Sequence, residues 1–219
     1  FRETLLVTAI ALPLNTVFGI VCALLIVRRR VPGKGVVNAF VDLPLALSPV
    51  VVGLSLFLLY GRTGWFGPWL QAHGIQVLFA TPAIVLATTF VSVPYVVREV
   101  VPTLREIGDE QEQAARTLGA SGWQAFWRIE FPLARAGLAS AAIFAFLTSW
   151  NEYALASQLT RTTASKTMPV GLMDFTAQFT VDWAGMSAMA VLIIVPALIL
   201  TFIVQKHLIA GLTFGGVKG

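Results

Sequence analysis

Long apolar segments recur along the chain, with shorter polar stretches between them. A helix needs about 20 mostly apolar residues to cross the hydrocarbon core of a bilayer. The stretches that reach this length are Leu5–Val27, Val36–Tyr60, Val77–Val97, Gly137–Leu159 and Trp183–Val204. The pattern predicts an all-α, polytopic membrane protein in which residues 1–219 form a single transmembrane domain with about five transmembrane helices.

The second apolar segment is the most irregular. Its core, "FVDLPLALSPVVVGLSLF", contains two prolines. The backbone groups that proline leaves free must be satisfied by neighbouring helices or by water, so a broken helix usually faces protein or a cavity. Ser48 in this segment is therefore a candidate pathway residue. The alternative is a kinked packing helix, because proline is common in spanning helices.

The composition agrees with a membrane location. Charged residues make up only 12% of the chain and hydrophobic residues 57%, whereas soluble domains carry roughly 25% charged residues. Lysine and arginine exceed the acidic residues, but in a membrane chain this excess usually reflects cytoplasmic loops, so we expect no nucleic-acid partner. Cys22 has no second cysteine to pair with, and His73 and His207 are isolated. We therefore expect no disulfide, no metal site and no cofactor in this chain.

The distribution of basic residues predicts the orientation in the membrane. With the amino terminus outside, most of them fall on the cytoplasmic side: Arg28, Arg29, Arg30, Lys34, Arg98, Arg105, Arg116, Arg128, Arg135, Lys206 and Lys218. The external segments then hold Arg2, Arg62, Arg161 and Lys166. The positive-inside rule favours this arrangement, with a cytoplasmic carboxyl terminus. The chain begins at Phe1 without a methionine, and we expect a further amino-terminal helix upstream of it.

A polar module interrupts the apolar pattern between the third and fourth segments. It reads "GDEQEQAARTLGASGWQAFWRIEFP" and covers residues 108–132. Asp109 and Glu112 have the spacing of a capping box, and Ser121 and Gln124 repeat it. Gly119 can end the first helix in the left-handed conformation, and a proline at position 132 ends the second. The sequence predicts two short helices inside a cytoplasmic loop over residues 98–136.

Both predicted helices have features of a contact surface. Small Ala114 and Ala115 lie beside the Gly119 turn, where another surface can approach the backbone closely. The second helix carries Trp123 and Trp127, a composition typical of a helix at an interface. The alternative is an ordinary surface hairpin, because capping boxes also occur by chance.

The complete string resembles the EAA loop of permease subunits of ATP-binding-cassette (ABC) importers. That loop has the pattern E-A-A-x3-G-x9-I-x-L-P. The matching positions here are Gln113, Ala114, Ala115, Gly119, Ile129, Phe131 and Pro132. Gln113 replaces the family's glutamate and Phe131 replaces its leucine, while every spacing is kept.

This resemblance implies a fold, partners and site residues. It implies the permease core of a type I importer in the cell inner (plasma) membrane, with a loop that docks on a separate ATPase. The implied ATPase-coupling residues are Glu112, Gln113, Ala114, Ala115, Leu118, Gly119, Ile129 and Pro132. The implied partners are two ATPase subunits, a second permease subunit that is either identical or different, an external solute-binding protein and the lipid bilayer.

The chain itself lacks the signature of an ATPase. A phosphate-binding loop requires G-x-x-x-x-G-K-[ST], and neither "PGKG" at 32–35 nor the terminal "GGVKG" has that spacing. We therefore expect that this chain is not an enzyme, that it has no catalytic residues, and that ATP with Mg²⁺ binds to the partner subunit.

The substrate is left open by two resemblances. From about residue 4 to 132, phrases such as "DLPLALSPVVVG" and "FVSVPYVVREVVP" are similar to sulfate/thiosulfate permeases. From residue 133 onward, "AAIFAFLTSWNEY" and "AGLTFGGVKG" look like carbohydrate permeases. The resemblance thus implies import of sulfate or thiosulfate, or of a carbohydrate.

Asn151 and Glu152 are further candidates for the substrate pathway. A carboxylate inside the membrane is costly and usually faces a cavity or a partner. Glu152 can bind a sugar's hydroxyls or contact a gate, or it can tie two helices together. A charged Glu152 repels sulfate unless it is paired or protonated, so this residue favours a carbohydrate.

Two other classes of protein remain as alternatives. A secondary transporter or channel would need no ATPase, and the EAA spacing would then be accidental. A membrane-embedded hydrolase using Glu152 would need a companion base, nucleophile or metal ligand, and the sequence offers none at a suitable spacing.

Overall fold

The computed structural model describes residues 1–28, 33–163, 165–177 and 179–214, with side chains described as far as Gln205. Arg29, Arg30 and Lys218, which entered the orientation argument, lie outside the described residues, as does the side chain of Lys206.

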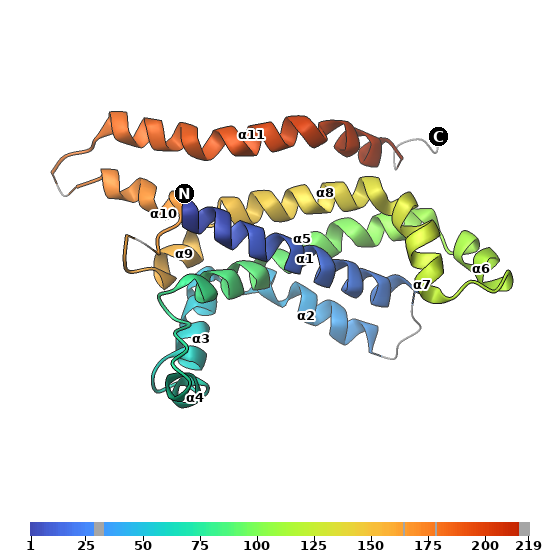
Figure 1. Cartoon of the computed structure of the whole chain (residues 1–219), viewed down its shortest axis with the longest axis horizontal. Helices are drawn as coiled ribbons and strands as arrows, with labels where there is room; N and C mark the ends of the chain where they lie inside the picture. The colour runs from blue at the N-terminus through green and yellow to red at the C-terminus, as the bar shows by residue number, and fades with distance from the viewer. Residues whose placement is uncertain (29–32, 164, 178, 215–219) are drawn as a thin grey trace.

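Four long helices dominate the fold. α1 (Arg2–Arg28), α5 (Thr81–Ile107) and α8 (Phe131–Trp150) pack together, and α11 (Trp183–Phe214) runs along α8 (Figure 1). Each of these helices belongs to a segment long and apolar enough to cross a membrane. The predicted all-α membrane architecture is confirmed for the described residues, whose only β-type pairing is the isolated bridge between Thr176 and Val181.

The second predicted span is broken into two helices. α2 (Lys34–Ala46) and α3 (Pro49–Tyr60) are bent by 107° relative to each other. The residue before a proline is pushed out of the helical region, and Ser48 is accordingly extended, with φ −69° and ψ 148°. Its hydroxyl accepts a 3.3 Å hydrogen bond from the Val51 N–H, so Ser48 caps α3. The predicted irregularity of this segment is therefore a sharp corner.

α5 and α8 approach each other closely. A Cβ added at Gly137 in α8 would lie 2.1 Å from the hydroxyl oxygen of Thr103 in α5. Only glycine fits this crossing without a shift of the neighbouring side chain. Small side chains let spanning helices pack through van der Waals contact. The buried residues beside this crossing are Val96, Val100, Leu104, Ala134, Ala141 and Ala145.

A large part of the surface is apolar. α11 contributes exposed Val191, Leu192, Ile194, Val195, Leu198, Ile199, Phe202 and Ile203. It is held to α8 by a 2.9 Å hydrogen bond from Trp150 Nε1 to the carbonyl oxygen of Ile193. Monomeric soluble proteins rarely expose apolar patches this extensive, so this face is suited to lipid or to another membrane subunit.

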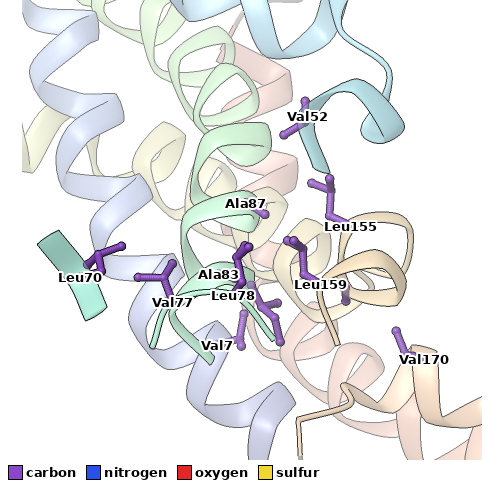
Figure 2. Close-up of a cluster of buried hydrophobic side chains, with 12 residues drawn as sticks. Val7, Val52, Leu70, Val77, Leu78, Ala83, Ala87, Leu155, Leu159 and Val170 are labelled. Carbon is purple, nitrogen blue, oxygen red and sulfur yellow. The ribbon is translucent and has the colours of Figure 1, made fainter. Parts of the chain in front are cut away.

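Short helices gather at the end of the bundle where α1 begins: α4 (Gly67–Ala72), α9 (Ala154–Leu159), α10 (Met168–Gly171) and the 3₁₀ turn η2 (Leu172–Phe175). Figure 2 shows side chains of α4, α9 and α10 meeting those of α1, α3 and α5 in one apolar cluster. Its labelled members are Val7, Val52, Leu70, Val77, Leu78, Ala83, Ala87, Leu155, Leu159 and Val170. The polar helices α6 and α7 lie at the opposite end (Figure 1).

Candidate coupling surface

The first helix of the polar module is α6 (Glu110–Thr117), and Gly119 ends it as predicted. Gly119 has φ +88°, a left-handed conformation that side-chain-bearing residues rarely adopt. Its N–H bonds to the Arg116 carbonyl at 3.0 Å, and the Ala120 N–H bonds to the Ala115 carbonyl at 3.0 Å. These two bonds form a Schellman motif, which satisfies carbonyls at the helix end.

The predicted capping box at the start of α6 is not formed. Asp109 makes no side-chain cap; its carboxylate instead accepts a 2.7 Å hydrogen bond from Nε2 of Gln113. Glu112 turns away to two arginines, Arg116 at 2.5 Å and Arg28 at 3.6 Å. The Glu112 carboxylate is therefore engaged by two guanidinium groups instead of the Asp109 N–H, and the box prediction was wrong here.

The second capping box is present. The Ser121 hydroxyl accepts from the Gln124 N–H at 3.3 Å, and the Gln124 side chain accepts from the Ser121 N–H at 2.9 Å. This box starts α7 (Gly122–Ala125), which continues into the π-helical turn η1 (Phe126–Glu130) and then into α8.

The prediction that Pro132 ends the second helix was wrong. Pro132 lies in the first turn of α8, where a missing N–H costs little. The chain passes it through a π turn, in which the Phe131 N–H bonds to the Phe126 carbonyl. The helical path from Gly122 therefore runs through the module into the bundle, with a change of hydrogen-bond register rather than a stop.

Several side chains of the module have no cover within this chain. Leu118 is 89% exposed, immediately before the Gly119 turn, and Trp123 is 72% exposed. Trp123, Trp127 and Phe131 form a row, with ring centroids 5.5 Å and 5.0 Å apart. Of the other predicted coupling residues, Gln113, Ala114, Gly119 and Pro132 are exposed and Glu112, Ala115 and Ile129 are partly buried. The polar module thus leaves Leu118 and the aromatic row uncovered.

A buried ionic cluster fastens this surface to α1. Arg28, the last residue of α1, donates from Nε to Oε1 of Glu130 at 2.6 Å and lies 3.6 Å from Glu112. The Arg28 side chain is only 10% exposed and that of Glu130 only 7%. One guanidinium therefore ties the end of a spanning helix to both parts of the module, α6 and η1.

This cluster was missed by reasoning from the sequence. Arg28 and Glu130 are 102 residues apart, and Arg28 was counted only as one cytoplasmic charge. The available signal was Glu130 itself, an acidic residue among the aromatic residues of its helix. An acidic side chain that is buried in such surroundings needs a partner.

The predicted pathway residues make local hydrogen bonds. Ser48 caps α3, and Asn151 Nδ2 donates to the Leu147 carbonyl at 2.9 Å. Glu152 lies in the break between α8 and α9, where Oε1 accepts from the Leu155 N–H at 2.8 Å. None of these three side chains hydrogen-bonds to another of the three. The predicted fourth span Gly137–Leu159 is thus interrupted at the two polar residues.

The described residues thus form a bundle of helices long and apolar enough to span a membrane, with a polar, partly uncovered helical module at one end. The chain belongs to the family described as the binding-protein-dependent transport system inner membrane component, whose model matches residues 15–213. It is therefore a multi-pass protein of an inner-membrane permease family.

Sulfate permeases are among the curated proteins to which the chain is similar. The chain is 44% identical over 171 residues to the sulfate transport system permease protein CysW of Synechococcus elongatus, covering 78% of this chain and 60% of that protein. It is 37% identical over 207 residues to CysW of Synechocystis, covering 93% and 75%. CysW of Escherichia coli is 36% identical over 200 residues, covering 91% and 69%. The second alignment necessarily extends beyond residue 132, so similarity to sulfate permeases is not confined to the first part of the chain.

Solved transporter structures share the fold. A bacterial ABC transporter that imports the acidic polysaccharide alginate has a TM-score of 0.70 at 20% identity, covering 95% of this chain and 74% of that chain. The inward-facing methionine ABC transporter MetNI has a TM-score of 0.71 at 19% identity, covering 96% and 93%. At these identities the likeness concerns the fold alone.

Proposed function

We propose that this chain is the permease subunit of an ATP-driven importer of sulfate, and that it couples the solute pathway to a separate ATPase. The observation that carries the coupling proposal is the uncovered end of α6, where Leu118 is 89% exposed beside the Gly119 turn. This end projects from a helix that the Arg28 cluster fixes to the bundle. An exposed apolar side chain on a helix that is attached to the bundle is suited to contact a partner protein and to transmit the partner's movement to the bundle.

The proposed partners follow from the separation of the solute pathway in this chain from ATP hydrolysis in another subunit. Two ATPase subunits would bind ATP and Mg²⁺, and one would receive the α6–α7 surface of this chain. A second permease subunit, identical or different, would cover part of the apolar face that α1 and α11 leave exposed, and lipid would cover the rest. An external solute-binding protein would deliver the substrate.

The proposed orientation places the start of α1 outside and α6 in the cytoplasm. These elements lie at opposite ends of the bundle (Figure 1), and the distribution of basic residues supports the choice of which end is cytoplasmic. Arg98 and Arg116 then lie toward the cytoplasmic end, and Arg62 and Arg161 toward the external end.

Sulfate is favoured over a carbohydrate for two reasons. Relatives up to 44% identical to this chain are sulfate permeases, and one alignment spans 93% of this chain. The main argument for a sugar was the charge of Glu152, which would repel an anion in an open pathway. That carboxylate accepts a hydrogen bond from the first turn of α9, so it has a local role that does not require a sugar.

In the proposed cycle, ATP binding closes the ATPase dimer and shifts the coupling helices. Because η1 continues into α8 and Arg28 links η1 to α1, both spanning helices would move with the surface. The importer would pass from an inward-facing to an outward-facing state, a population shift driven by the different affinity of the two states for ATP. Solute would then pass along the pathway, for which Ser48, Asn151 and Glu152 are the proposed lining residues.

The ATPase activity of the assembled importer tests substrate and coupling together. The complex is incubated with sulfate-loaded or with sugar-loaded solute-binding protein, and ATP hydrolysis is measured. Stimulation by the sulfate-loaded protein alone is the expected result. Stimulation by a sugar-loaded protein alone would overturn the substrate, and sulfate uptake that needs no ATPase would favour a secondary transporter.

A further inference from the structure

A cavity of about 810 Å³ lies near the end of the bundle where α1 begins. Its walls come from the end of α3, the turn into α4, the segment before α5 and Arg161 after α9. Its floor shares Leu70, Val77 and Leu78 with the apolar cluster of Figure 2. None of the residues assigned above to coupling or to the pathway lines this cavity.

The polar groups that line this cavity suit an anion. Two arginines, Arg62 and Arg161, contribute to the lining, and the Thr63 hydroxyl adds a hydrogen-bond donor. The amides of Gln71 and Gln76 donate to the Arg62 and Leu78 carbonyls, at 3.0 Å and 3.2 Å, and so hold the wall together. Among the residues that the structure describes, the lining contains no aspartate and no glutamate. Guanidinium groups bind oxyanions through paired, charge-assisted hydrogen bonds, and no carboxylate in the wall competes for them.

Arg161 is held in place by an aromatic ring. Its guanidinium carbon lies 4.1 Å from the centroid of Phe79, a cation–π contact. Phe79 has φ +59°, and it is the one described residue other than glycine with a positive φ. A bulky residue in this conformation is strained, and such strain is concentrated at functional sites. The strained backbone presents the ring on which Arg161 rests.

Another part of the lining is a tight turn between α3 and α4. A Cβ added at Gly67 would lie 2.0 Å from the Gly61 carbonyl oxygen, and one at Gly61 would lie 2.4 Å from the Phe57 carbonyl oxygen. The Phe66 N–H closes the turn by bonding to the Leu59 carbonyl at 2.9 Å. One side of the cavity is therefore a tightly packed, hydrogen-bonded turn.

We propose that this cavity binds a divalent tetrahedral oxyanion of the sulfate class between Arg62 and Arg161, at the external face of the importer. The proposal rests on the proposed function, which supplies both the external location and the substrate. It adds a receiving site on the permease itself. An anion released by the solute-binding protein would be held there before it enters the membrane.

Radiolabelled sulfate provides the test. Binding is measured by equilibrium dialysis on the assembled permease–ATPase complex without the solute-binding protein, for the unaltered chain and for Arg161→Gln and Arg62→Gln. Losing one charge-assisted partner should weaken sulfate binding by about tenfold or more. The matched control is Arg2→Gln, which removes the same charge from the same end of the molecule outside the cavity. It should bind sulfate normally. Phe79→Leu should give a smaller loss, because both charges remain.

Two results would overturn the inference: absence of saturable sulfate binding, or equal weakening by Arg161→Gln and Arg2→Gln. Thermal unfolding of each variant is recorded alongside. Should Arg161→Gln unfold early, Arg161→Lys decides the matter, since it keeps a charge and should retain part of the binding. ATP-driven sulfate uptake by the unaltered importer is measured separately. Uptake without binding at the arginines contradicts this inference alone, whereas failure of uptake contradicts the proposed function.

Discussion

Arg28 at the end of α1 and Glu130 at the end of η1 form a buried ion pair, with Nε and Oε1 2.6 Å apart. Removing one partner of a buried pair leaves an uncompensated charge and typically costs about 3–5 kcal/mol. We predict that Arg28→Ala markedly lowers the unfolding temperature of the purified permease and abolishes ATP-driven uptake. Scanning fluorimetry and vesicle transport measure the two effects.

Arg98→Ala is the matched control for this prediction. Arg98 also pairs with an acidic residue on another helix, Asp42, but its side chain is 63% exposed. Exposed ion pairs typically contribute about 0–1 kcal/mol, well below a buried pair, so this variant should lower the unfolding temperature much less than Arg28→Ala does. The exchanged pair Arg28→Glu with Glu130→Arg should recover part of the loss. Equal unfolding temperatures for Arg28→Ala and Arg98→Ala would refute the role of the buried cluster.

The Gly119 turn should be sensitive to backbone conformation rather than to side-chain volume. No atom lies within 4 Å of a Cβ placed at Gly119, but its φ is +88°. We predict that Gly119→Val reduces co-purification with the ATPase and its stimulated activity, because the left-handed conformation costs about 1–2 kcal/mol for a residue with a side chain. Gly119→Asn should be milder, since asparagine tolerates this conformation. Equal behaviour of the two variants would show that the turn geometry is unimportant.

Substitution of Leu118 distinguishes an effect on docking to the ATPase from an effect on folding of the permease. Its side chain is 89% exposed, so Leu118→Asp should leave the unfolding temperature of the permease alone unchanged. If this side chain enters the partner subunit, the same change should strongly reduce co-purification with the ATPase, because it places a charge in an apolar contact. Leu118→Met keeps the apolar character and should bind normally. Normal assembly of Leu118→Asp would remove Leu118 from the coupling surface.

Glu152→Gln tests the pathway role. Glutamine keeps an oxygen that can accept from the Leu155 N–H, so folding should be preserved. If Glu152 lines the pathway, loss of its negative charge should change the apparent affinity for sulfate in uptake measurements. Unchanged uptake together with unchanged stability would leave Glu152 as a helix cap only. Glu152→Ala, which loses the acceptor, should cost about 0.5–2 kcal/mol as other cap deletions do.

Much of the fold follows from local rules, and the exceptions have identifiable causes. Apolar length predicted the spanning segments, and the Ser121 box and the Gly119 turn formed as local chemistry requires. The box at Asp109 failed because Glu112 is drawn toward Arg28, a residue distant in the sequence. Pro132 did not stop its helix, because a π turn carries the chain past it.

Some features of the candidate sites could likewise be predicted from local sequence, and others could not. The Gly119 turn and the Ser121 capping box could be predicted from spacing, because each is formed by residues within one short segment. Arg161 and Phe79 could not be paired from the sequence, since only the folded chain brings the turn after α9 beside the segment before α5. Nor did any pattern predict the positive φ of Phe79, which is an unfavourable conformation for its residue type.

ATP-driven sulfate uptake into proteoliposomes tests the central claim most directly. The permease is reconstituted with its ATPase and sulfate-loaded binding protein, and radiolabelled sulfate inside the vesicles is counted with ATP, without ATP, and with Gly119→Val in place of the unaltered chain. We predict accumulation that requires ATP and falls sharply in the variant. Accumulation that proceeds equally without ATP, or no sulfate accumulation while another solute is taken up, would contradict the account.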